Sequence, residues 1–168
     1  MRFRYGQWGK PALTASQGGD LTFNLSNSGG IALLAVAHRR RLGVDVELIR
    51  PLSDLASIAE SYFSATENAV LANLPAEQQA DAFFNCWTRK EAYIKAVGGG
   101  LSLPLDAFDV SLAPGAPAIL LATRPDPAEA RRWSLRALDP AAGYAAALIF
   151  DGPPARLSTW RWSPAELA

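Results

Sequence analysis

The feature of this sequence that most constrains its fold is one long helical segment in the middle of the chain. It begins near Pro75, a residue favoured in the first turn of a helix, and runs to Val97. The three glycines at 98–100 then end it. At about 100° per residue, one side of this helix carries an apolar stripe, made of Ala80, Phe83, Phe84, Trp87 and Ile94. Any fold for this chain has to be built around this helix.

Strands are expected on the N-terminal side of the helix. Apolar and polar residues alternate over 21–25, and the runs 31–37 and 42–47 are also typical of strands. A turn is expected over 26–30. The short basic turn 38–41 predicts that the second and third of these strands pair as a hairpin.

Two shorter helices and four more strands complete the pattern. Ser53-Asp54 can cap a helix that runs to about Phe63, and Ser64 with Glu67 has capping-box spacing for the next helix. Strands are expected again beyond Pro104, over 108–112, 119–122, 133–138 and 144–150. Strands, then helices, then strands predict an α+β domain.

A length of 168 residues suggests one domain or two small halves that share a core. With 49% hydrophobic and 19% charged residues, the chain can bury a real core. We expect a single domain over 1–151 and a Pro-rich peripheral arm over 152–168, which Trp160 and Trp162 could dock.

The balance of charge excludes several classes of partner. Lysine plus arginine equals aspartate plus glutamate at 16 each, so no overall field favours nucleic acid or an anionic membrane. No apolar run approaches the roughly 20 residues that a membrane span needs, and the single cysteine, Cys86, fits a reducing compartment. These features favour a cytoplasmic protein. Cys86, near the apolar stripe, and the only histidine, His38, are interpreted as a packing and a surface residue.

Two carboxylates lie two positions apart on one predicted strand. Asp45 and Glu47 point the same way, while Val44 and Val46 point to the core. Their backbones are roughly 7 Å apart, so like charges repel unless a cation lies between them. Magnesium, which prefers oxygen ligands, would meet that need. Taken alone, however, this dipeptide pattern favours a solvated strand face over a metal site.

A third carboxylate lies within the apolar stripe of the long helix. Glu91 projects between Trp87 and Phe84, and a carboxylate there should have a partner. Lys90 and Lys95 fall on the two margins of the stripe, where ammonium groups suit a phosphate-bearing ligand. Two simpler interpretations remain open, namely a pair of Glu91 with Lys95 at i,i+4 spacing and an exposed Glu91 at the edge of the stripe.

Three further segments allow both a structural and a functional interpretation. The glycines at 98–100 stop the helix, and they could also let backbone approach a ligand. The segment 24–29 is an ordinary Asn/Ser turn or a set of anion-binding groups. The arginines at 39–41 are either a solvated turn or a basic patch for a partner.

Taken together, these residues resemble a known family. The segment Gly43-Val44-Asp45-Val46-Glu47, followed by Trp87-Thr88-Arg89-Lys90-Glu91-Ala92-Tyr93-Ile94-Lys95-Ala96, is similar to the paired signature of the 4′-phosphopantetheinyl transferases. In the same order, the chain carries similar elements at Tyr5-Gly6 with Gly9-Lys10-Pro11, at 23–29, at 62–67 and at 100–108. The resemblance covers residues 2 to 150 and is to the two-half type that serves polyketide and nonribosomal peptide carrier proteins.

The resemblance implies a fold and an activity. The fold is an antiparallel sheet packed on a long helix. The activity is that of a holo-[acyl-carrier-protein] synthase type enzyme, which transfers 4′-phosphopantetheine from coenzyme A to a serine of an apo carrier protein and releases 3′,5′-ADP.

The resemblance also implies roles for particular residues. Magnesium would be held by Asp45, Glu47 and Glu91, and Glu91 would take the serine proton. Coenzyme phosphates and nucleotide would be contacted by a larger set, namely Lys10, Pro11, Ser26, Asn27, Lys90 and Lys95, with Lys95 also counted as catalytic.

The chain departs from the family pattern in two ways. Asn27 stands where the family usually has histidine, and asparagine cannot carry a positive charge. By the resemblance, we also expect the chain to correspond to the second half of the two-half fold, with most of the first half absent. Self-association to rebuild the cleft, or loss of efficient catalysis, would follow. Two alternatives to an active enzyme are a non-catalytic homologue that binds coenzyme A or a carrier protein, and an unrelated interaction domain.

Overall fold

The computed structural model describes residues 2–6, 9–100, 103–124 and 126–162. Its elements in chain order are β1 (Phe3–Tyr5), β2 (Pro11–Leu13), α1 (Ala15–Gly18), β3 (Leu21–Ser28), β4 (Ile31–His38), β5 (Leu42–Leu48), α2 (Leu55–Tyr62), α3 (Ala65–Ala72), α4 (Ala76–Val97), η2 (Leu105–Ala107), β6 (Phe108–Val110), β7 (Leu120–Thr123), η3 (Glu129–Arg132), β8 (Trp133–Leu138) and β9 (Tyr144–Asp151). Leu101 and Ser102 of the family-like elements, and residues 163–168 of the expected arm, lie outside the described residues.

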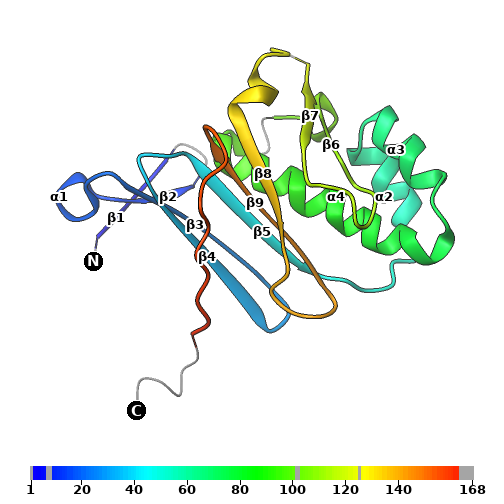
Figure 1. Ribbon diagram of the computed structural model, residues 1–168, viewed down its shortest axis with the longest axis horizontal. Helices are drawn as coiled ribbons and strands as arrows, with labels where there is room; N and C mark the ends of the chain where they lie inside the picture. Colours follow the sequence, from blue (N-terminus) through cyan, green and yellow to red (C-terminus); the bar gives the residue numbers. More distant parts are fainter. Residues whose placement is uncertain (1, 7–8, 101–102, 125, 163–168) are drawn as a thin grey trace.

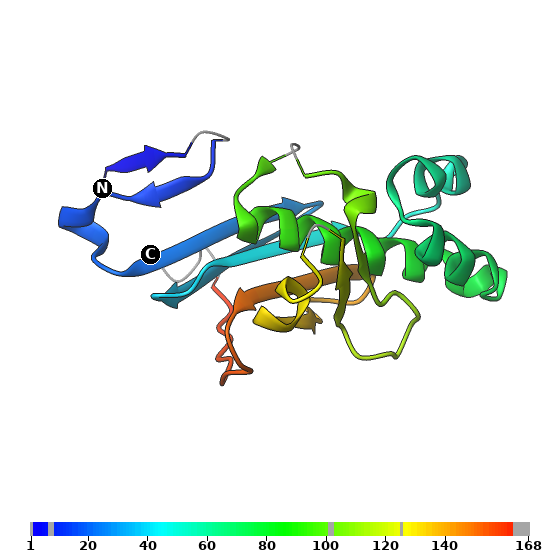
Figure 2. The ribbon, with the colours of Figure 1, turned by 90° about the horizontal axis from the view of Figure 1, so that it is seen from above.

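A three-stranded antiparallel sheet and the long helix α4 form the centre of the molecule. The strand order is β5-β9-β8, and α4 lies along one side of β5 and β9 (Figures 1 and 2). The core between them is apolar, as side chains on the inner face of the sheet and on α4 require, and includes Phe83, Ala92, Ile94, Ala147 and Ile149. The predicted α+β fold, with an antiparallel sheet on a long helix, is confirmed.

The closest approach between sheet and helix occurs at Gly43 of β5. A Cβ atom built on Gly43 would lie 2.0 Å from the carbonyl oxygen of Ala92 and 2.6 Å from the amide nitrogen of Ala96. No side chain fits at such distances, so glycine is required here by packing. The residues of β5 that share this face, Asp45 and Glu47, are therefore held on the helix side of the sheet.

The strands before β5 pair differently from the prediction. β3 pairs with β4 along its whole length in a hairpin of its own, and β5 pairs with β9, so the expected hairpin of 31–37 with 42–47 is wrong. Side chains of β3 instead bridge to β5. Asn24 Oδ1 accepts a hydrogen bond from the amide of Val44 at 2.8 Å, and Ser28 Oγ accepts one from Leu48 at 3.1 Å. The partner numbers rise together, so β3 runs parallel to β5.

The helices begin and end near the expected residues. Ser64 Oγ accepts from the amide of Glu67 and Glu67 Oε2 accepts from the amide of Ser64, which confirms the capping box of α3. Helix α4 follows Pro75 and ends at Gly98, whose φ of 77° is the left-handed conformation that favours glycine. Gly98 therefore ends the helix, as the sequence predicts.

The outer face of the β3–β4 hairpin is apolar and exposed. Leu25 is 52% exposed and its cross-strand neighbour Leu34 is 63% exposed. Leu21 and Val36 are also exposed. The C-terminal arm leaves β9 on the side opposite α4 (Figure 2). Trp160 and Trp162 of the arm are exposed, so they do not dock it. None of the described helices is long and apolar enough to span a bilayer.

Candidate functional site

The acidic pair of β5 is held by two serines of β3. Ser26 Oγ donates to Asp45 Oδ1 at 2.7 Å, and Ser28 Oγ donates to Glu47 Oε2 at 2.7 Å. The spacing of two residues on both strands places each hydroxyl against its own carboxylate. The predicted common face of Asp45 and Glu47 is therefore built into the contact between β3 and β5.

Lys95 of α4 joins the same group of side chains. Its ammonium donates to Asp45 Oδ1 at 2.6 Å, to Ser26 Oγ at 3.0 Å and to the carbonyl of Val44 at 3.4 Å. The interpretation in which Lys95 pairs with Glu91 is not what the structure shows, because Lys95 pairs with Asp45. This ammonium partly neutralises the acidic pair.

Asp45 is buried, and one of its oxygens lacks a partner. Only 3% of the residue is exposed. Among the described residues, Asp45 Oδ2 is buried without a hydrogen-bond donor. Burial raises the pKa of Asp45, although Lys95 and Ser26 act against this rise. A buried carboxylate oxygen without a partner is unfavourable unless a further ligand completes it.

Glu91 faces the same cluster from the helix. Burial raises the pKa of Glu91, and repulsion from Asp45 and, more weakly, Glu47 raises it further. Lys95 acts in the opposite direction. Within the described part of the chain, Glu91 has no hydrogen bond or ion pair. The three carboxylates thus influence one another electrostatically, and Glu91 lacks the partner that its position requires.

The donor set fits a hard divalent cation, although it is not preassembled around one. No three His, Cys, Asp or Glu side chains of the described ranges are grouped closely enough to hold a metal as they stand. The ammonium of Lys95 lies where it competes with a cation for Asp45. The unpartnered Asp45 Oδ2 and the unpartnered Glu91 are oxygen donors of the kind that magnesium prefers.

A pocket of about 230 Å³ opens beside this cluster. It lies between the segment after β1, strand β3 and the C-terminal half of α4, and it is lined by Gly9, Lys10, Pro11, Asn24, Glu91, Ile94, Lys95, Gly98 and Gly100. The structure therefore brings Lys10, Pro11, Glu91 and Lys95 of the predicted site to one cavity. Gly98 and Gly100 also contribute backbone to its wall.

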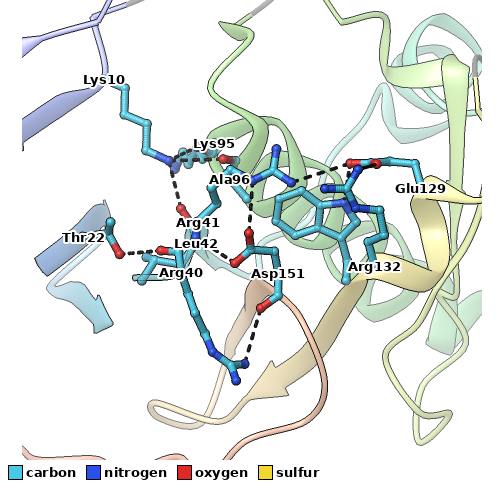
Figure 3. Close-up of polar contacts among 11 residues, drawn as sticks. Lys10, Thr22, Arg40, Arg41, Leu42, Lys95, Ala96, Glu129, Arg132 and Asp151 are labelled. Atoms are coloured by element: carbon cyan, nitrogen blue, oxygen red, sulfur yellow. Dashed lines mark hydrogen bonds and ion pairs between the residues drawn. The ribbon is translucent and has the colours of Figure 1, made fainter. Parts of the chain in front are cut away.

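Lys10 uses its ammonium inside the protein. Figure 3 shows it pointing at the end of α4, where it donates to the carbonyls of Leu42, at 3.0 Å, Lys95 and Ala96. Burial lowers the pKa of Lys10, and the nearby positive charge of Arg41 lowers it further. In this arrangement Lys10 holds the segment after β1 against the helix and forms one wall of the pocket.

Two predicted phosphate contacts lie away from the pocket. Lys90 is 0% exposed and forms a 2.7 Å ion pair with Glu67. It also donates to the carbonyls of Leu105 and Phe108, so all three of its donors are used in the core. The prediction that Lys90 contacts phosphate is therefore wrong for this structure. Asn27 lies on the opposite face of β3 from Ser26 and is exposed.

Sequence reasoning missed the roles of Asn24 and Ser28. It placed a turn over 26–30, whereas β3 continues to Ser28 and only Gly29 and Gly30 turn. The missed signal was the alternation of polar side chains at Asn24, Ser26 and Ser28, which puts all three on the face toward β5.

Comparison with known proteins identifies a family. A sequence model of the 4′-phosphopantetheinyl transferase superfamily matches residues 41–149. The 4′-phosphopantetheinyl transferase HetI of Nostoc sp. is 41% identical over 155 residues, which are 90% of this chain and 61% of HetI. The 4′-phosphopantetheinyl transferase Sfp of Bacillus subtilis is 38% identical over 112 residues, which are 67% of this chain and 48% of Sfp. This chain thus spans about three fifths of HetI, and its match to Sfp about half of Sfp.

Solved structures support the fold. The holo-[acyl-carrier-protein] synthase (AcpS) of Thermotoga maritima superposes with a TM-score of 0.52 at 18% identity, over 66% of this chain and 61% of that protein. Since the sequence model of the superfamily matches residues 41–149, from β5 through α4 into β9, this chain belongs to the 4′-phosphopantetheinyl transferase superfamily.

Proposed function

We propose that this protein transfers 4′-phosphopantetheine from coenzyme A to a serine of an apo acyl or peptidyl carrier protein, with a magnesium ion. The observation that carries the proposal is the electrostatic interaction of Glu91 with Asp45 and Glu47, beside a pocket that Glu91 and Lys95 line. Family membership supports the reaction class. The unpartnered Asp45 Oδ2 supports a cation.

The reaction breaks one bond of a diphosphate. The carrier serine oxygen attacks the phosphorus on the pantetheine side, a new P–O bond forms, and the P–O bond to 3′,5′-ADP breaks. The electron pair of the broken bond leaves with 3′,5′-ADP. A magnesium ion bound by Asp45, Glu47 and Glu91 would neutralise charge on the diphosphate.

The protein side chains have separate tasks in this scheme. Glu91 accepts the proton of the serine hydroxyl, directly or through a water, and its raised pKa suits a general base. Lys95 lines the pocket with a partly exposed side chain, so it can turn its ammonium from Asp45 to a phosphate oxygen. Gly98 and Gly100 line the space proposed for the phosphates, and Ser26 lies next to it, within hydrogen-bond distance of Lys95.

The relatives bear on the substrate class. HetI and Sfp are named as 4′-phosphopantetheinyl transferases, and both match this chain by sequence, whereas AcpS matches by fold at 18% identity. We therefore propose carriers of the polyketide or nonribosomal peptide kind in preference to the narrower holo-[acyl-carrier-protein] synthase activity. A cytoplasmic location is part of the proposal, because the buried thiol of Cys86 fits a reducing compartment.

Self-association of the chain is a further part of the proposal. The exposed apolar face of the β3–β4 hairpin, with Leu25 and Leu34 at its centre, supports it. Asn27 is exposed on the same face of β3 as Leu25, so it would lie at the contact with a second copy. Light scattering of the protein and of Leu34→Lys tests this point, and a monomeric wild-type protein with full activity would contradict it.

The direct test of the proposed function is transfer to a carrier. Purified protein is incubated with coenzyme A, Mg²⁺ and an apo peptidyl carrier protein, and the mass of the carrier is measured. We expect a gain of one phosphopantetheine arm, and no gain with Asp45→Asn. A wild-type protein that binds coenzyme A without modifying any carrier would favour the alternative, a non-catalytic binding homologue.

A further inference from the structure

Each of two serines of β3 donates a hydrogen bond to only one oxygen of a carboxylate on β5. Ser26 donates to Asp45 Oδ1 and Ser28 donates to Glu47 Oε2, both at 2.7 Å. Asp45 Oδ2 has no partner, and Glu47 Oε1 has none among the described residues either. Each carboxylate therefore presents one unbonded oxygen while the other is fixed.

Ser28 is itself fixed from two directions. Its Oγ donates to Glu47 and accepts from the amide of Leu48, so the hydroxyl hydrogen has one orientation. Such a doubly bonded hydroxyl restricts the long side chain of Glu47, which otherwise has several rotamers. The hydroxyl can therefore set the position of the carboxylate.

The turn after Ser28 is anchored to the neighbouring sheet. The amide of Gly30 donates to Tyr144 Oη at 3.1 Å. A Cβ atom on Gly29 would lie 2.6 Å from the same hydroxyl, and Gly29 has a φ of 55°, so only glycine fits without strain. Tyr144 is the cross-strand partner of Leu48, and the amide of Leu48 donates a hydrogen bond to Ser28 Oγ. The end of β3 is thus tied to β5 and β9 at the level of Glu47.

We infer that Ser28 is a positioning residue that orients Glu47 for monodentate binding of the cation, as Ser26 does for Asp45. This inference rests on the proposed function, because it assigns the unbonded oxygens to the magnesium site. Hydrogen bonds to metal-binding carboxylates typically contribute about 10- to 100-fold to metal affinity. Ser28 matters here through Glu47 and does not touch the substrate.

Binding of Mn²⁺ alone to the full chain tests the inference, with the free ion measured by electron paramagnetic resonance. We expect Ser28→Ala to weaken Mn²⁺ binding about tenfold, and Ser28→Thr, which keeps the hydroxyl, to restore most of it. Ser61→Ala is the matched control and should leave Mn²⁺ binding unchanged, because among the described residues Ser61 Oγ donates only to the carbonyl of Ser57 within α2. If Ser28→Ala does not fold, Ser28→Cys supplies a weaker donor of similar volume.

A second readout separates positioning from a purely structural role. With Ser28→Ala, the Mg²⁺ concentration for half-maximal transfer should rise about tenfold, while kcat at saturating Mg²⁺ stays near the wild-type value. Mn²⁺ binding by a folded Ser28→Ala protein equal to wild type would overturn the inference and leave the proposed function intact. Equal Mn²⁺ binding by wild type and Glu47→Gln would overturn the metal site itself, and the inference with it.

Discussion

Asp45 and Lys95 form an ion pair, with 2.6 Å between Oδ1 and Nζ, at the point where strand β5 faces helix α4. The pair is asymmetric, because 4% of the Asp45 side chain and 28% of the Lys95 side chain are exposed. Lys95 can therefore move toward the pocket, whereas Asp45 stays in place. In the absence of a cation, the ammonium of Lys95 partly compensates the buried negative charge.

Lys95→Met should separate the binding of the cation from the binding of the coenzyme. Removal of a competing ammonium should leave Mn²⁺ affinity equal or higher, while loss of a phosphate contact should lower affinity for coenzyme A about tenfold or more. Calorimetric titration with each ligand measures both effects. Parallel weakening of Mn²⁺ and coenzyme A would show that Lys95 does not compete for Asp45.

Lys90→Met should act on stability instead. It leaves the carboxylate of Glu67, 1% exposed, without its ion-pair partner in the core. Breaking such a buried pair typically lowers the free energy of unfolding by about 3–5 kcal/mol, which urea denaturation can measure. If Lys90→Met kept its stability and instead lost coenzyme A affinity, the placement of Lys90 in the core would be contradicted.

Gly43→Ala should destabilise the contact between β5 and α4. The added Cβ meets backbone atoms of Ala92 and Ala96, which cannot move without shifting the helix. We expect a loss of about 2–3 kcal/mol in the free energy of unfolding. Gly30→Ala is the matched control, because a Cβ there meets nothing within 4 Å, and its effect should stay within about 0.5 kcal/mol.

Glu91→Gln should change how stability depends on pH. The raised pKa of Glu91 means that the folded protein holds a proton that the unfolded chain releases. This contribution is fully present below the pKa of the unfolded chain and is lost as pH rises through the raised, folded-state pKa. Glutamine is neutral throughout, so Glu91→Gln should match wild type near pH 4 and melt about 1–3 °C higher at pH 7.5 without metal, a small shift because solvent screens the site.

Thermal melts across pH, with EDTA present, measure this difference. Added Mg²⁺ should raise the Tm of the wild type and not that of Glu91→Gln. If the Tm of Glu91→Gln differed from that of the wild type by the same amount at every pH, the charge of Glu91 would not be the cause of the difference.

The sequence was most informative where structure is local. The capping box of Ser64 and Glu67, the end of α4 at Gly98 and the common face of Asp45 with Glu47 all follow from short-range rules, and the structure has each of them. The predicted strands also lie within two residues of most observed ones.

What the sequence could not predict depends on contacts between distant segments. Lys90 was placed at a margin of the apolar stripe, but α3, η2 and β6 cover that margin and supply Glu67 and two carbonyls. Likewise, Ser26 and Ser28 favour a turn by local propensity, but pairing with β4 and hydrogen bonds to the carboxylates of β5 keep them in a strand. Local periodicity carries no information about which neighbour covers a helix face.

The most direct test of the central claim is a crystal structure of the protein with coenzyme A and Mn²⁺, in which the anomalous signal locates the cation. We predict one peak at about 2.0–2.3 Å from oxygens of Asp45, Glu47 and Glu91, with the ammonium of Lys95 turned to a phosphate. A cation bound elsewhere, with Lys95 still on Asp45 and Glu91 facing away, would contradict the account.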